Sequence, residues 1–475
     1  MIRGLNFALQ LPDVTRVSTS TKVGASSARA ASENSAADNN ASAKVIFGSQ
    51  SSDIAAVYSL SPKKMSANAV QQLNPVIEGL MHTAQSSSSI SSLATLGSTL
   101  LGNLKENRGD VTQAVTGVAA ETASAANKFA VTLSVVTKSG STVNLTMTQQ
   151  DDGLAVEMKT EGEALSDDDA AAVASLGDAL SKTLNGLGQM PPKLDIGGLT
   201  NFDNKLLQSV DLKTDVRNGE DSLQSLNFHA DDKERAIAYQ DGDFSLKMSS
   251  DLSKPGLAGS HAQQQQALKA YDDKFDKARL AGNGDRGQME TMKSVFRALN
   301  STSDAESASA LRGQNLMLSA NGVSQLSGLN DFSLSFTQAE KSPNPAHENE
   351  KDRFSYAASQ SSEVQAHDDG AKTVKQTTRS HLSAAWHDAI DPSIPLALNK
   401  MKSSQNYLYH LVENDDENTT TLNVNGRGML TSVGHDEKVD HRSTVKKYVL
   451  DKMVDETVTP EKYANSSLRS FMATA

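Results

Sequence analysis

The segment from Gly282 to Gly287, GNGDRG, has the G-x-G-x-x-G spacing of a dinucleotide-binding turn. In such a turn the glycines let the backbone approach a pyrophosphate, which binds N–H groups at the start of the following helix. The candidate cofactor-binding residues are therefore Gly282, Gly284 and Gly287. Asp304 lies near the distance at which an acid that binds the ribose would be sought.

A dinucleotide site needs a buried strand directly before the glycines, and residues 263–281 do not have that character. They read QQQQALKAYDDKFDKARLA, which has the composition and period of a helix and no Val- or Ile-rich run. No second strand precedes Asp304 either. We therefore expect the glycine loop to join two amphipathic helices. The apolar residues of these helices include Tyr271, Phe275, Met292 and Phe296.

Histidines elsewhere in the sequence are spaced less suitably for binding a metal ion. His347-Glu348 lacks the second His that a zinc-binding helix needs. The tetrapeptide HDDG, which begins at His367, is typical of a hairpin turn rather than a metal cluster. His435 and His441 lie near several acids and could bind a divalent ion, although a solvated turn is the simpler interpretation. We therefore predict no metal site.

Two further patterns could belong to an enzyme. SPKK, at residues 61–64, matches the S-x-x-K of penicillin-recognising enzymes, but their partner motifs are missing. Trp386, His387 and Asp388 could line a pocket, yet the one Trp of a chain with 4% aromatic residues is typical of a core anchor. No G-x-S-x-G, P-loop or EF-hand loop is present. The sequence thus predicts no catalytic residue.

The composition limits the size of the core and the choice of partners. Of the 475 residues, 37% are hydrophobic, so we expect one or two modest cores surrounded by polar segments. The formal net charge of -12 disfavours a nucleic-acid surface, because neutralising phosphates needs clustered Lys and Arg. No stretch reaches the roughly 20 apolar residues that span a bilayer as a helix.

Cysteine is absent, which excludes a disulfide framework, a thiolate zinc site and a cysteine nucleophile. Its absence also fits a chain that is exported unfolded. The first residues carry only a short apolar run, broken by Asn6, Gln10 and Pro12, and do not resemble a secretory signal. We expect a protein that is either cytoplasmic or exported without a classical signal peptide.

The pattern of polar and apolar residues predicts an α+β protein in which antiparallel β-meanders pack with amphipathic helices. We expect six segments: a disordered Ser/Ala-rich segment 1–42, a helical segment 43–126, a meander–helix–meander core 127–258, a helical hairpin 259–300, a linker 301–328, and a β-rich region with a terminal helix 329–475.

The core has the clearest pattern. Residues 128–162 alternate strictly between apolar and polar, with breaks at KSGS and QDDG, which predicts a three-stranded meander with one buried face. Ser166 is the expected cap of a helix whose Leu stripe covers that face. Residues 194–212 are expected to wrap the same core, and residues 223–248 to form a second meander.

After residue 329 the β period is weaker, and many of the residues are Ser, Thr, Gln and Lys. This favours a long, thin sheet with a solvated surface, either as an ordinary edge-rich sheet or as a docking surface for another chain. Asp369-Gly370 and Asn425-Gly426 predict type I′ hairpin turns. Apolar spacing predicts a last helix through Val445, Tyr448, Val449 and Met453.

Residues 131–212 resemble a family of uncharacterised proteobacterial proteins. In that family a meander ending in G-L-x-V-E precedes a Leu-Ser-acidic helix start, an L-x-G-L helix end, and the run P-P-x-L-D-x-x-G-L-x-x-F-D. The matching positions are Gly153, Leu154, Val156, Glu157, Leu165, Ser166, Leu184, Gly186, Leu187, Pro191, Pro192, Leu194, Asp195, Gly198, Leu199, Phe202, Asp203, Ser209, Val210, Asp211 and Leu212. Members are sometimes labelled lactate dehydrogenase by automatic transfer, so the resemblance implies a bacterial setting and offers that activity as an alternative.

The expected function is that of a non-enzymatic structural or protein-interaction protein, possessing no cofactor. The expected partner is another protein, or a second copy bound through the polar β-strands. The alternative is an NAD-dependent oxidoreductase that uses the glycine loop at Gly282.

Overall fold

The computed structural model describes residues 45–47, 56–58, 75–85, 87, 89–106, 110–116, 128–150, 153–219, 221–253, 257, 259–301 and 324–471. Contacts divide the chain into Met1–Ser42 and a compact unit Ala43–Ala475. The disordered segment expected at 1–42, and most of the linker expected at 301–328, lie outside the described residues.

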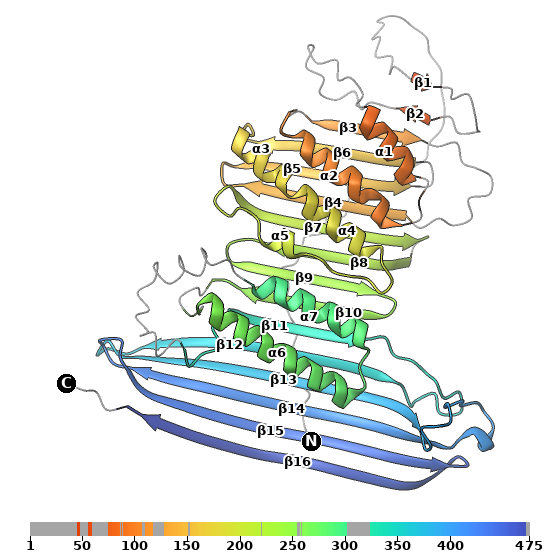
Figure 1. The fold of residues 1–475 in the computed structure, drawn as a ribbon, viewed down its shortest axis with the longest axis vertical. Helices are drawn as coiled ribbons and strands as arrows, with labels where there is room; N and C mark the ends of the chain where they lie inside the picture. Colours follow the sequence, from red (N-terminus) through yellow and green to blue (C-terminus); the bar gives the residue numbers. More distant parts are fainter. Residues whose placement is uncertain are drawn as a thin grey trace, which may run out of the picture. The chain divides into compact units, whose positions relative to one another are not determined.

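The compact unit is built on one antiparallel sheet (Figure 1), so the expected α+β class is confirmed in its coarse form, with more strand than helix. The sheet order is β1-β2-β3-β6-β5-β4-β7 followed by β8 to β16 in sequence. The strands are β1 Val45–Phe47, β2 Ala56–Tyr58, β3 Val111–Thr116, β4 Lys128–Thr137, β5 Ser141–Gln150, β6 Gly153–Gly162, β7 Leu207–Asn218, β8 Asp221–Ala230, β9 Glu234–Asp241, β10 Phe244–Asp251, β11 Asp331–Gln338, β12 Arg353–Ala366, β13 Lys372–Ala389, β14 Tyr407–Val424, β15 Leu430–Val449 and β16 Lys452–Ser470.

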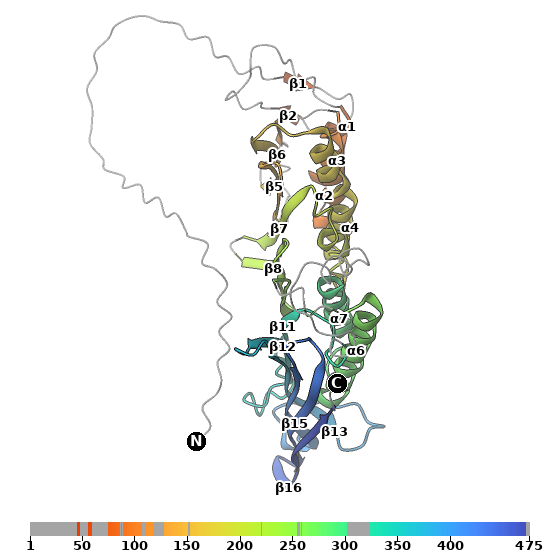
Figure 2. The same cartoon turned by 90° about the vertical axis from the view of Figure 1, so that its left-hand side faces the viewer.

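The helices that the structure describes lie against one face of this sheet (Figure 2). They are α1 Pro75–Gln85, α2 Leu93–Asn103, α3 Asp167–Ser175, α4 Gly177–Leu187, α5 Gly197–Thr200, α6 His261–Gly282 and α7 Arg286–Asn300, with the 3-10 turn η1 Ile90–Ser92. A second 3-10 turn, η3 Lys402–Ser404, lies in the connection between β13 and β14. None of these helices is long and apolar enough to cross a membrane. The opposite face, which we call the outer face, carries no described helix.

A row of paired residues on the helix-facing side shows where the core lies. From β6 to β12 the row is Met158, Leu145, Leu133, Leu212, Phe228, Ile237, Met248, Leu334 and Ala358, all of them buried. It continues through β13 to β16 as Ser380, Asp416, Val439 and Tyr463. Because burying a Leu or Phe side chain stabilises by about 1.5–3 kcal/mol, the apolar part of the row holds the helices on the sheet.

The first predicted meander is confirmed as β4, β5 and β6, and the second as β8, β9 and β10. Ser166 caps α3, since its Oγ accepts a hydrogen bond from the Asp169 N–H at 3.1 Å. The predicted helix divides at Gly177, which begins α4, and a Cβ there would lie 3.1 Å from the Ser98 carbonyl oxygen. Gly177 thus allows α4 to pack closely on α2.

Residues 194–212 do not simply wrap the core, because β7 pairs with β4 on one side and β8 on the other. The two meanders are therefore parts of a single sheet that continues across the expected segment boundaries. The segment 43–126, expected to be helical, also contributes β1, β2 and β3.

The predicted terminal helix is wrong. Val445 lies in β15 and Met453 lies in β16, and these two strands pair over almost their whole length. They are joined at Leu450 and Asp451, whose φ angles of 51° and 67° are both left-handed. Two consecutive left-handed residues are what a type I′ hairpin needs, but Gly and Asn usually occupy these positions, so the sequence carried no visible turn signal.

The two hairpins that the sequence did mark have a different turn from the one expected. Only Gly370 in the first loop and Gly428 in the second have positive φ, 80° and 77°. In the first loop the Gly370 N–H donates to the His367 carbonyl at 3.0 Å, and in the second Gly428 donates to Asn425 at 2.8 Å. Each loop is thus a tight turn closed by one left-handed glycine, a common longer hairpin connection.

Candidate interaction surface

The structure places GNGDRG between two helices. α6 ends at Gly282, and Asn283 follows in the left-handed conformation, with φ 55° and ψ 36°. Asp285 then caps α7, because its carboxylate accepts a hydrogen bond from the Gln288 N–H at 2.9 Å. The helix–turn–helix prediction is confirmed, and the positive end of α7 already interacts with a carboxylate of the chain itself.

The first two glycines of this turn, Gly282 and Gly284, have a packing role. A Cβ on either Gly282 or Gly284 would lie 2.8 Å from the ring of Phe354 in β12, closer than packed carbon atoms approach. A Cβ on Gly287 would meet nothing nearer than 3.4 Å. Gly282 and Gly284 therefore let the turn pack against the sheet. Asp304, the expected ribose-binding acid, lies outside the described residues.

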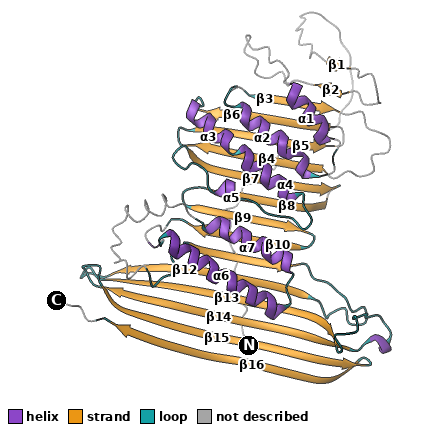
Figure 3. Ribbon diagram, in the orientation of Figure 1, coloured by secondary structure: helices purple, strands orange, loops and turns teal. Residues whose placement is uncertain are grey.

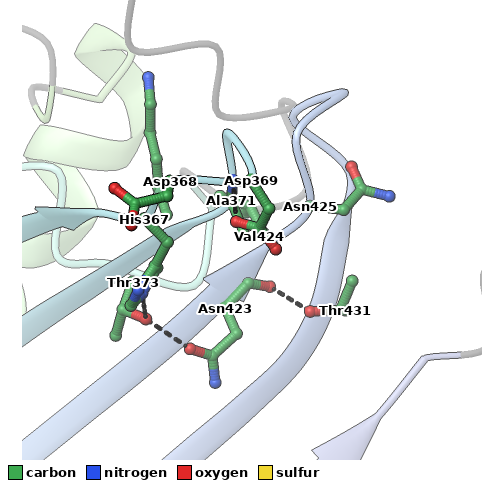
Figure 4. Close-up of a pocket in the computed structure, with 10 residues that line it drawn as sticks. His367, Asp368, Asp369, Ala371, Thr373, Asn423, Val424, Asn425 and Thr431 are labelled. Carbon is green, nitrogen blue, oxygen red and sulfur yellow. Dashed lines mark hydrogen bonds between the residues drawn. The ribbon is translucent and has the colours of Figure 1, made fainter.

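The polar groups around His367 line an open depression of about 580 Å³ between the β12–β13 and β14–β15 loops (Figure 4). Thr373 Oγ1 donates to Asn423 Oδ1 at 2.8 Å, and Thr431 Oγ1 donates to the Asn423 carbonyl at 2.9 Å. His367 Nε2 lies 3.0 Å from Thr373 Oγ1. These groups bind one another across the hairpins, as the turn interpretation predicts.

The other predicted histidines are dispersed. His347 Nε2 lies 2.8 Å from Asp451, and Glu348 is exposed. His435 contacts Thr420, while His441 lies 2.9 Å from Asp416. Ser61–Lys64 falls outside the described residues. Within the described part of the chain, no three His, Asp or Glu side chains form a group that could hold a metal ion.

Trp386 and His387 lie on opposite faces of β13, so they line no common pocket. Trp386 packs against the main core and stacks on His410, with ring centroids 4.6 Å apart and planes at 2°. His387 is buried on the outer face, where Nδ1 lies 2.6 Å from Asp352 and Nε2 lies 3.4 Å from Glu350. Asp388 is exposed.

The His387 cluster was not predicted, because its two acids belong to a loop whose fold the sequence did not indicate. Burial lowers the pKa of His387, but hydrogen bonds to Asp352 and Glu350 outweigh it, and the pKa is raised. Burial raises the pKa of Glu350, yet hydrogen bonds from His387 and Tyr407 bring it below its ordinary value. The cluster therefore holds the His387 ring between two carboxyl groups, an arrangement that favours its protonated form.

This cluster closes the loop of residues 339–352 over the ends of β13 and β14. Tyr407 Oη donates to Glu350 at 2.7 Å, and Asn344 Nδ2 donates to Gln405 Oε1 at 2.8 Å. Most of its groups are buried and contact one another, so the arrangement stabilises a loop.

The outer face of β13 to β16 is strongly charged. Arg379, Glu417 and Lys438 form a continuous row across three strands, with contacts of 2.7 and 3.0 Å. The next row is His381, Asp415, Asp440 and Lys462, one residue from each strand. The row through His381 continues from β13 into β12 and on to β4, where it carries fewer charges. Its residues there are Ala357, Ser335, Lys247, Ala238, Asn227, Lys213 and Thr132.

β16 is the last strand of the sheet, and of the described strands only β15 pairs with it (Figure 1). All of its residues, Lys452–Ser470, are exposed, which means that neither face of the strand is covered. Figure 3 shows no described α-helix over β15 and β16. The exposed apolar residues of β16 are Met453, Val454, Val458, Tyr463 and Leu468.

An edge strand of this kind presents backbone N–H and C=O groups to another chain. The sequence predicted polar strands and a possible docking edge in this region, but it did not predict which strand forms the edge, because residues 445–453 were assigned to a helix. The resemblance to a proteobacterial family stays a prediction. No family model, curated protein or solved structure matches the chain, so the interpretation of this surface rests on its own residues.

Proposed function

We propose that this chain is a non-enzymatic structural or interaction protein whose binding element is the exposed edge strand β16. The observation that carries the proposal is the exposure of all of Lys452–Ser470 on a strand that pairs on one side only. We place it in a bacterial setting as an exported or surface-associated protein, which the cysteine-free, polar sequence favours.

The physical support comes from the backbone. In an antiparallel strand every second residue directs its N–H and C=O toward the free side. A pairing strand satisfies these groups, and each hydrogen bond contributes about 0.5–1.5 kcal/mol net. A strand of 19 residues can therefore supply a substantial binding energy, while the side chains decide which partner fits.

The alternative, an NAD-dependent oxidoreductase, loses its main support from the same geometry. Gly282 and Gly284 pack on Phe354, and the start of α7 is capped by Asp285. A pyrophosphate at that helix end would have to displace the cap and would meet its negative charge.

Hydrogen–deuterium exchange of the full chain tests the proposal directly. We expect the backbone amides of β16 to exchange quickly in dilute protein and to become protected at high concentration or when the natural partner is added. The amides of β5, which lies inside the sheet, serve as the internal reference. Unprotected β16 amides under all conditions, together with saturable NADH binding, would overturn the proposal.

A further inference from the structure

The side chains of β16 carry a charge pattern that is complementary to itself. On the outer face, Glu456 lies opposite Lys446 of β15, and Lys462 lies opposite Asp440. Lys462 Nζ also forms an ion pair with Asp440. The two outer-face charges of β16, Glu456 and Lys462, are thus opposite in sign and equally far from Thr459, which lies midway between them.

We propose that β16 pairs antiparallel with β16 of a second copy of this chain, in the register that places Thr459 of both copies on a two-fold axis. This inference rests on the proposed function and names its partner. The sheet then continues from one copy into the other, and the same surface is used on both sides, as in most homodimers.

The register follows from cross-strand charge. With Thr459 on the axis, Glu456 of each copy lies opposite Lys462 of the other. Each row then reads Lys446, Glu456, Lys462 and Asp440 across the interface, with alternating signs. Opposite charges directly across a strand pair stabilise it, and like charges destabilise it.

Neighbouring registers lose this pattern. An axis at Val458 places Asp455 opposite Glu461, and an axis at Glu461 places two glutamates face to face. An axis at Pro460 puts the two prolines opposite each other, although neither has an N–H to donate. In the Thr459 register the helix-facing side brings together Asp455 with Tyr463 and Thr457 with Glu461, without like charges.

Pro460 and Lys462 also restrict which strands can pair here. Proline and lysine are residues that proteins place on edge strands to prevent indiscriminate pairing. A foreign strand leaves the Lys462 charge without a matched acid, whereas a second copy supplies Glu456 to each Lys462. The free edge of β16 therefore disfavours pairing with unrelated strands and favours pairing with β16 of a second copy.

Charge reversal tests the pairing. By light scattering and analytical ultracentrifugation of the full chain, we expect the wild type to be dimeric at micromolar concentration. Glu456→Lys and Lys462→Glu should each weaken dimerisation by about tenfold, since both interface pairs become repulsive. An equimolar mixture of the two variants should form a heterodimer, and the double variant should recover the homodimer. The control Glu461→Lys, on the other face, should change the dimer much less.

A disulfide tests the register independently, because the chain contains no other cysteine. Residues on the axis of an antiparallel pair have Cα atoms about 4.5–5.5 Å apart, within the range that a disulfide spans. Thr459→Cys should therefore form a linked dimer on mild oxidation. Thr457→Cys should not, since its two copies are offset by four residues, about 13 Å along the strand.

The outcomes separate this inference from the function on which it rests. A monomeric wild type at high concentration, or reversal variants that dimerise as the wild type does, overturns the pairing with a second copy. If β16 amides nevertheless become protected with a different protein, the interaction function stands. If they remain unprotected with every partner, both fail.

Discussion

The sheet has two regions that are stabilised differently. From β3 to β13, helices cover one face, and the row through Leu145, Leu133 and Leu212 is wholly buried. From β14 to β16 the corresponding row is Asp416, Val439 and Tyr463, and the outer face carries charged rows instead. A one-residue slip in the first region would expose its whole core. In the second region β14 and β15 still carry buried apolar residues, such as Val412, Leu422 and Val433, and only in β16 would a slip exchange one set of exposed side chains for another.

The difference teaches that two mechanisms fix strand register in one sheet. Burial of alternate residues does so where the helices lie. Cross-strand charge pairs and turns do so in the C-terminal strands, where each exposed pair contributes about 0.2–1 kcal/mol. The end of the second region, β16, is therefore held by small contributions from its one neighbouring strand. It is suited to gain stability by pairing with another strand.

The largest expected effect contrasts a residue of each region. Leu145→Ala removes a fully buried side chain from β5 and should reduce the free energy of unfolding by about 2–5 kcal/mol. Val458→Ala in the exposed strand β16 should change it by less than about 0.5 kcal/mol. Urea denaturation followed by circular dichroism measures both, and equal losses would refute the distinction between the regions.

The second effect concerns the glycine turn. Gly284→Ala places a methyl group 2.8 Å from the Phe354 ring and should cost about 1–3 kcal/mol of stability. Gly287→Ala, with 3.4 Å to its nearest neighbour, should be nearly neutral. Thermal unfolding of the two variants measures the contrast. A loss that is equal at both positions would contradict the packing role of Gly284.

The third effect is a pH dependence of the loop that covers His387. The raised pKa of His387 gives stability that is complete below its unfolded value of 6.5 and is lost as pH rises through the folded value. The lowered pKa of Glu350 gives stability present above 4.5 and lost as pH falls through its folded value. Closure of residues 339–352 should therefore be strongest between these two values.

Hydrogen exchange of residues 341–352, corrected for the intrinsic pH dependence, measures this closure. His387→Gln should remove the loss at alkaline pH. His381→Gln, at an exposed position of the same strand, is the matched control and should leave the loop unchanged. Identical alkaline profiles for wild type and His387→Gln would show that another group opens the loop.

The smallest expected effect is a gain. Leu450 and Asp451 hold left-handed φ angles, which cost a non-glycine residue about 1 kcal/mol each. Replacing both, Leu450→Asn with Asp451→Gly, supplies the preferred type I′ residues and should slow amide exchange in β15 and β16 severalfold. The Asp451 change also removes the His347 contact, so Leu450→Asn alone is the cleaner comparison.

The sequence predicted much of the helix-covered region. Strict alternation in residues 128–162 indicated β4 to β6, and Ser166 with its following acids indicated the start of α3. The period before Gly282 was sufficient to predict a helix rather than a strand. These signals are local, because they depend on spacing within one element and on the groups that cap it.

The sequence did not predict the terminal strands. The apolar spacing around Tyr448 imitates a helix, and the turn at Leu450 lacks the usual glycine, so no local signal separated β15 from β16. Nor did it reveal why Gly282 and Gly284 are glycines, since Phe354 is remote in sequence.

The sequence by itself thus determined the alternation, the caps and the absence of cysteine chemistry. Only the tertiary structure decided which strand forms the edge, which glycines pack against an aromatic ring, and that Asp352 and Glu350 meet His387. The physical reason is that these features depend on contacts between residues far apart in the chain, and a periodic pattern specifies which face of an element is apolar without specifying what that face meets.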